Sequence, residues 1–275
     1  MTVSFVWRPT PAALNTGLKV ALLALCLQLA ACSSTKDELT SSNAERLYKE
    51  ARDDISSGSY ERAIKSLERV EGLAAGSLLA QQALLDLAYA NWRSGEKTTA
   101  LSTVDRFVKL NPSSPALDYA LYLRGMINFN DDLGLLGNLF GQDLSERDQR
   151  AARDAYQAFK QLSDQFPASR YTPDARQRMG FIVNLLANYE VHVARYYYRR
   201  GAYVAAAARA QQAVADFQSS PATEEALYIM AASYDKLELT ALRDDADRVL
   251  RKNYPNSAYL SDGLAARDRR WWKFW

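Results

Sequence analysis

The stretch AYANWRSGEKTTALSTVDRFVKLNP, residues 88–112, places small residues at fixed distances around one glycine. Ala88 lies seven residues before Gly95, and Ala100 lies five residues after it. Helix-forming residues flank the glycine on both sides, and Pro112 ends the second segment. Because small side chains let two antiparallel helices approach closely, this stretch predicts a helix–turn–helix unit.

The same spacing recurs elsewhere in the chain. Residues 58–63 read GSYERA and residues 201–206 read GAYVAA, each with a glycine, four other residues and an alanine, as in the first stretch. The 34-residue tetratricopeptide repeat (TPR) is such a helical pair, with small residues where its helices touch. The sequence therefore predicts an all-α TPR solenoid of about five helix–turn–helix repeats over residues 44–262.

Two of the five units depart from the pattern. In the third, Gly125 and Ala155 take the two small positions only if an insertion at about 131–149 separates the helices. In the fifth, Ala231 fits, but Arg243 stands at the second small position, so this unit is degenerate.

A long helix is expected in the fourth unit. Between residues 169 and 201 the helix-breaking residues are Pro173 and Gly180 alone. Proline is tolerated in the first turn of a helix. One helix should therefore run from about Thr172 to Arg200.

Residues 1–31 have the pattern of a secretory signal peptide. Arg8 and Lys19 precede an apolar run at residues 20–31, which is interrupted by Gln28. A run of this length is too short for a membrane span, which needs about 20 residues. Its end, LAAC at residues 29–32, resembles the lipobox of bacterial lipoproteins.

That resemblance implies cleavage before Cys32, whose thiol and new amino group are then acylated. Residues 32–43 would form a lipidated tether, because they are polar and poor in apolar side chains. Two serines and no aspartate follow the cysteine, which is typical of lipoproteins sent to the outer membrane. We expect anchoring in its inner leaflet, facing the periplasm, through several acyl chains. The alternative is an ordinary signal peptide with incidental cysteines.

Composition argues against several functions. The 34 basic and 32 acidic residues nearly balance, so nothing favours nucleic acid as a partner. With a single histidine, His192, neither a zinc site nor a Ser-His-Asp triad can be assembled. We expect no metal, no cofactor and no enzymatic activity, since TPR arrays bind peptides and partner segments.

Two longer stretches resemble the BamD family, TPR lipoproteins of the machinery that assembles outer-membrane β-barrels. One is DRFVKLNPSSPALDYALYLRGMINFN at 105–130, followed by the insertion DDLGLLGNLFGQDLSERD. The other is LANYEVHVARYYYRRGAYVAAAARAQ at 186–211. The sequence departs from the family at AAGSLL, residues 74–79, and at its C-terminus.

The resemblance implies a scaffold that promotes folding and insertion of outer-membrane proteins. Its C-terminal repeats would bind the periplasmic domains of the barrel-assembly protein, and it would dock a companion lipoprotein. Its N-terminal repeats would receive unfolded β-barrel precursors. Arg209 lines up with a family arginine that is tied to contact with the barrel-assembly protein.

Further candidates for partner contact are aromatic or basic. Tyr197 and Arg200 belong to a tyrosine–arginine cluster on the long helix, although core packing accounts for some of its tyrosines. Phe140 lies in the insertion, which either contacts a partner or packs onto its own repeat. An aromatic groove for precursors would use residues that could equally serve packing between repeats: Tyr48, Tyr60, Tyr89 and Trp92.

The tail, residues 263–275, ends in RDRRWWKFW. Tryptophan beside lysine or arginine is typical of the membrane–water interface. The tail could instead insert into a pocket of a partner through Trp271, Trp272 and Trp275.

Two other functions remain open. One is a TPR lipoprotein for pilus-secretin assembly or for coordination of cell-envelope division, against which the Phe140-Gly141 insertion argues. The other is an enzyme of cell-wall metabolism, which would need a buried glutamate with a raised pKa. No glutamate stands out in the sequence.

Overall fold

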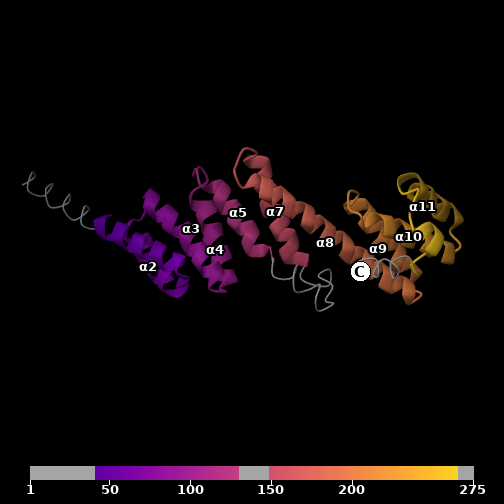
Figure 1. Cartoon of the computed structure of the whole chain (residues 1–275), viewed down its shortest axis with the longest axis horizontal. Coiled ribbons are helices and arrows are strands. Elements are labelled where there is room, and N and C mark those ends of the chain that lie inside the picture. The colour runs from indigo at the N-terminus through magenta and orange to yellow at the C-terminus, as the bar shows by residue number, and fades with distance from the viewer. Residues whose placement is uncertain (1–40, 130–148, 266–275) are drawn as a thin grey trace, which may run out of the picture. The chain divides into compact units, whose positions relative to one another are not determined.

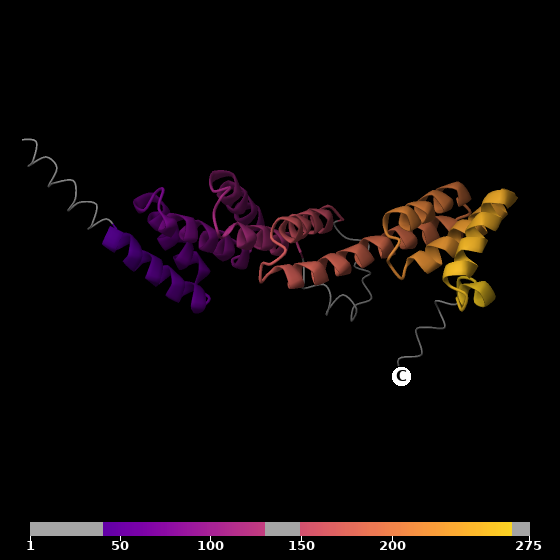
Figure 2. The same cartoon turned by 90° about the horizontal axis from the view of Figure 1, so that it is seen from above.

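The computed structural model describes residues 41–129 and 149–265 (Figures 1 and 2). The chain divides into two compact units, Met1–Asn111 and Pro112–Trp275. All regular secondary structure in these residues is helical. The predicted all-α fold of helix–turn–helix repeats is therefore confirmed for the described part of the chain. None of its helices is both long enough and apolar enough to cross a membrane.

The first unit contains two helical pairs. Residues 41–56 are helical and are followed by α2 (Tyr60–Leu73), α3 (Leu78–Arg93) and α4 (Lys97–Leu110). Helix α3 packs against both α2 and α4. The small residues at the helix contacts are fully buried, namely Ala63, Ala88 and Ala100, together with Ala51, which lies seven residues before Gly58.

The second unit contains three further pairs and a short final helix. Each helix packs against the next along the chain from α7 to α11, and α5 packs against α7. The helices are α5 (Leu117–Asn128), α7 (Gln149–Gln165), α8 (Thr172–Arg199), α9 (Tyr203–Asp216), α10 (Thr223–Lys236), α11 (Thr240–Asn253) and α12 (Tyr259–Asp262).

The third pair forms as the spacing predicts, although residues 130–148 separate α5 from α7. Gly125 of α5 faces the ring of Phe159 of α7, and a Cβ at this glycine would overlap the ring. Phe159 itself is fully buried. The glycine is therefore what allows these two helices to approach.

The turns inside the first, second, fourth and fifth pairs share an unusual backbone conformation. Gly58, Gly95 and Gly201 have φ angles of 76°, 95° and 77°, a region that glycine enters without a steric penalty. At the equivalent point of the fifth pair, between α10 and α11, Glu238 has φ 60°. The degenerate repeat thus keeps the turn without its glycine.

The long helix is also confirmed. Helix α8 runs through 28 residues, with Pro173 in its first turn and Gly180 in its interior. It is long enough to pack against α7 with its first part and against α9 and α10 with its second (Figure 2).

Candidate protein-binding surfaces

An aromatic cluster lies where α2 meets α3 in the first unit. The ring centroids of Tyr60 and Tyr89 are 6.5 Å apart, and those of Tyr89 and Trp92 are 6.0 Å apart, both edge to face. The guanidinium of Arg93 lies 5.5 Å from the Tyr60 ring and 5.9 Å from the Tyr89 ring. The three rings are half-buried and the arginine is exposed. The cluster therefore presents aromatic rings to solvent, with the positive charge of Arg93 over two of them.

Helical spacing brings this cluster together. Tyr89, Trp92 and Arg93 stand at positions i, i+3 and i+4 of α3 and share one face of it. Tyr60 is the first residue of α2, which packs on that helix. The sequence analysis selected the three aromatic residues and missed Arg93. Because Arg93 lies four residues after Tyr89 in the same helix, the spacing could have shown that it shares the face of Tyr89.

Tyr48, the fourth residue predicted for the groove, has a different environment. Its hydroxyl donates a hydrogen bond of 2.8 Å to Asp86 of α3, and Arg52 reaches the same carboxylate at 3.1 Å. Burial, followed by the neighbouring Asp86 charge and hydrogen bond, raises the pKa of Tyr48 to about 12. Tyr48 therefore connects the first helix to α3 in its protonated form.

Arg209 of α9 forms an ion pair with Glu190 of α8, with 3.0 Å between Nη1 and Oε2. The Glu190 side chain is only 2% exposed, whereas that of Arg209 is 41% exposed. The arginine thus neutralises a buried carboxylate from the surface.

The tyrosines of α8 face different ways. Tyr197 is half-buried and packs against the alanine-rich core formed by α8, α9 and α10. Tyr196 is 52% exposed, and the exposed Arg200 lies over its ring at 5.4 Å. The accessible tyrosine–arginine pair is therefore Tyr196 with Arg200, and sequence reasoning, which selected Tyr197, could not tell which neighbour faces solvent.

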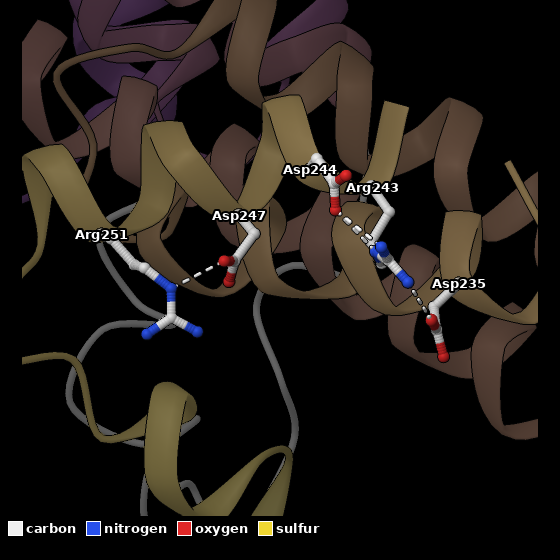
Figure 3. Close-up of polar contacts among 5 residues, drawn as sticks. All are labelled: Asp235, Arg243, Asp244, Asp247 and Arg251. Atoms are coloured by element: carbon white, nitrogen blue, oxygen red, sulfur yellow. Dashed lines mark hydrogen bonds and ion pairs between the residues drawn. The ribbon is translucent and has the colours of Figure 1, made fainter. Parts of the chain in front are cut away.

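A cavity of about 520 Å³ opens between α10, α11 and α12 in the second unit. Part of its lining is charged. As Figure 3 shows, Arg243 of α11 contacts Asp235 and Asp244, while Arg251 contacts Asp247 of the same helix. These carboxylates raise the pKa of both arginines.

The remaining lining of this cavity is largely apolar. Three tyrosines contribute to it, and two of them, Tyr228 and Tyr259, stack with ring centroids 5.7 Å apart. Burial raises the pKa of Tyr198 and of Tyr228, so both hydroxyls stay protonated at neutral pH. The cavity is lined by Tyr198, Tyr228, Ala231, Ala232, Asp235, Lys236, Arg243, Asp244, Asp247, Leu250, Arg251, Tyr259 and Leu260.

Several predicted residues lie outside the described residues, namely Cys32, Phe140, Trp271, Trp272 and Trp275. Within residues 41–129 and 149–265, no three acidic, histidine or cysteine side chains come together as metal ligands would. The surfaces described above consist of aromatic rings, arginines and carboxylates. They are suited to recognising other polypeptides.

The family model and the curated relatives that match this chain point to the same family of outer-membrane proteins. The family described as "YfiO: Outer membrane lipoprotein" matches residues 40–250. "Outer membrane protein assembly factor BamD" of Neisseria meningitidis serogroup B is 44% identical over 259 residues, covering 92% of this chain and 97% of the relative. The proteins of that name in Haemophilus influenzae and Xylella fastidiosa (strain Temecula1) are 33% and 34% identical, over 85% and 88% of this chain and 89% and 84% of theirs.

One solved structure with a similar fold is more distant in sequence. A putative kinesin light chain with TPR-like repeats from Podosopora anserina is 16% identical, with a TM-score of 0.34, over 78% of this chain and 96% of its own. At that level of similarity it adds nothing to the fold described above.

Proposed function

From the fact that the chain belongs to the YfiO family of outer membrane lipoproteins, we propose that it is an outer-membrane protein assembly factor. The relatives that share the larger part of its length carry that description. In this role it is a non-enzymatic scaffold, which holds partner proteins and unfolded precursors and catalyses no covalent step.

Anchoring through Cys32 is part of the proposal. The lipobox at residues 29–32 and the family description as outer membrane lipoprotein support it. The acylated cysteine would hold the chain to the inner leaflet of the outer membrane, with the helical repeats in the periplasm. Residues between the anchor and the first described helix would then act as a polar tether.

Unfolded precursors would bind at the aromatic cluster of Tyr60, Tyr89, Trp92 and Arg93. This cluster is the single observation that carries the assignment, because it combines half-buried rings with an exposed arginine above two of them. The BamD resemblance implies precursors that end in an extended strand with aromatic side chains. Such a strand could stack on the rings and direct backbone carbonyls or its carboxylate toward Arg93.

The second unit would contact the barrel-assembly protein. Arg209 stands at the position that the family resemblance assigns to this contact, and it is exposed enough to reach a partner. The Tyr196–Arg200 pair offers a neighbouring aromatic and basic surface on α8. Companion lipoproteins would join the same complex.

Precursor binding can be tested with a labelled synthetic peptide of alternating apolar residues that ends in phenylalanine. Trp92→Ala and Arg93→Ala should each weaken its affinity at least about fivefold, since truncation of a central anchor costs 1 kcal/mol or more. Tyr196→Ala is the matched control, because it also removes a ring beneath an arginine but lies in the second unit. Equal effects of all three variants would contradict the assignment.

Partner binding can be tested by purifying the tagged full chain from membranes in mild detergent and identifying co-purified proteins. The barrel-assembly protein and companion lipoproteins should be recovered with the wild-type chain and the Arg209→Lys variant, and lost with Arg209→Glu. Recovery of pilus secretins or division proteins instead would contradict the proposed function.

A further inference from the structure

The last helical pair of the second unit is incompletely covered. Helix α10 packs against both helices of the preceding pair, α8 and α9. The corresponding element after α11 is α12, which packs against α10 but is only four residues long. Terminal repeats need a cap, because no neighbouring repeat covers their apolar face.

The cavity of about 520 Å³ lies at this uncovered position. Its lining includes residues from both helices of the last pair and from α12 itself, where Tyr259 and Leu260 contribute. It presents the rings of Tyr198 and Tyr228 together with exposed carboxylates on α10 and α11. Only one oxygen each of Asp235, Asp244 and Asp247 takes part in the contacts drawn in Figure 3.

The described chain ends beside this cavity. Gly263 follows α12 with φ 57°, and a Cβ there would lie 2.8 Å from the hydroxyl of Tyr228, a residue of the cavity wall. Leu264 then packs against the alanine-rich core of α8, α9 and α10, as Tyr228 does. The next ten residues, 266–275, hold three tryptophans, a phenylalanine and four basic residues. Even seven of them extend over roughly 24 Å, so they can reach the cavity.

We propose that residues 266–275 fold back into this cavity and cap the last repeat of their own chain. The tryptophan rings would pack against the tyrosines, where aromatic pairs add to the burial of apolar area. The three carboxylates of the lining are matched by three basic side chains, so the basic residues of the tail would be held locally, by hydrogen bonds to carboxylate oxygens outside the ion pairs of Figure 3. Being tethered, the tail has a high effective concentration at the cavity. This inference does not depend on the proposed function.

Disulfide trapping in the full chain, in isolated membranes, tests the proposal. Ala232→Cys introduces a thiol in the cavity wall, and Trp272→Cys introduces one in the tail. Under a mild oxidant this pair should form an intramolecular disulfide, seen as a gel shift that reduction reverses. Val204→Cys with Trp272→Cys is the matched control, because Val204 is 70% exposed on α9 and does not line the cavity.

The cavity pair should cross-link at least about tenfold faster than the control pair, because docking concentrates the tail at one site. Adding Asp244→Lys and Asp247→Lys should reduce that rate several-fold by repelling the basic tail. Equal rates for the two cysteine pairs would mean that the tail lies elsewhere, for instance in lipid. A cross-linked dimer in place of the intramolecular product would show that the occupant comes from a second copy. Either result overturns the proposal.

Discussion

The guanidinium of Arg209 lies 3.0 Å from the carboxylate of Glu190, and this contact joins a half-exposed residue of α9 to a fully enclosed one of α8. A residue proposed to meet a partner therefore also neutralises a charge inside its own unit. Loss of partner binding on mutation of Arg209 can thus arise in two ways, and the experiments must separate them.

The first prediction concerns the stability of this pair. Arg209→Ala should lower the free energy of unfolding by about 2 kcal/mol, because it leaves the Glu190 charge buried without its partner. Chemical denaturation followed by circular dichroism would measure the loss. Arg248→Ala breaks the exposed pair with Asp245 and should change stability by no more than about 0.5 kcal/mol.

Replacing both members of the buried pair provides the complementary test. Arg209→Ala with Glu190→Gln should recover a large part of the stability, since no uncompensated charge then remains inside. If the double variant is as unstable as Arg209→Ala alone, the buried charge is not the cause of the loss. A stable double variant that still fails to recover partners would place the binding role on Arg209 itself.

Gly125→Ala should destabilise the second unit by about 1–3 kcal/mol, the range for overpacking a tight core. The added methyl would overlap the Phe159 ring, so α5 and α7 would have to move apart. Combining it with Phe159→Leu should recover part of the loss by making room. Gly180→Ala provides the control, because a Cβ there meets open space, and this variant should be neutral or slightly stabilising.

Glu238→Gly should stabilise the turn between α10 and α11 by about 1 kcal/mol, since Glu238 holds a left-handed conformation that disfavours side chains. Gly201→Ala, in the equivalent turn between α8 and α9, should have the opposite effect of similar size. In thermal melts, the melting temperature should rise for Glu238→Gly and fall for Gly201→Ala. A destabilised Glu238→Gly chain would mean that the glutamate side chain contributes more than its backbone costs.

Tyr48 makes the first unit sensitive to high pH. Its pKa is raised to about 12 from an ordinary value of about 10, so the folded state retains the phenol proton more tightly than the unfolded state. The corresponding stability is complete below pH 10 and is lost as the pH rises through 12. Denaturation of wild type and Tyr48→Phe from pH 8 to 12 should show a steeper loss in the wild type. Parallel curves would contradict a pKa of Tyr48 raised by burial and by Asp86.

Much of the fold could be predicted because the repeat pattern is local. A glycine with small residues at fixed distances specifies a helical pair, and this held for the pair around Gly95 and for the long helix α8. Even the pairing of α5 with α7 followed from Gly125 and Ala155, despite the residues between the helices. Helix contacts of this kind depend on side-chain size, which the sequence states directly.

The candidate surfaces were less predictable. Tyr60, Tyr89 and Trp92 were identified as aromatic candidates, but the sequence did not show that Arg93 lies over two of them. Tyr196 and Tyr197 are neighbours of the same residue type, and only the packing of α8 against α9 and α10 decides which one is exposed.

The sequence by itself determined the helical repeat and the family, because both depend on residue type and local spacing. The lipobox with Cys32 rests on the same kind of local pattern and stays a prediction. Only the tertiary structure showed that Arg209 is bound to Glu190, that Tyr48 is bound to Asp86, and that a cavity remains beside the last helical pair. These relations join residues from different helices. They depend on how the helices pack, which spacing along the chain does not specify.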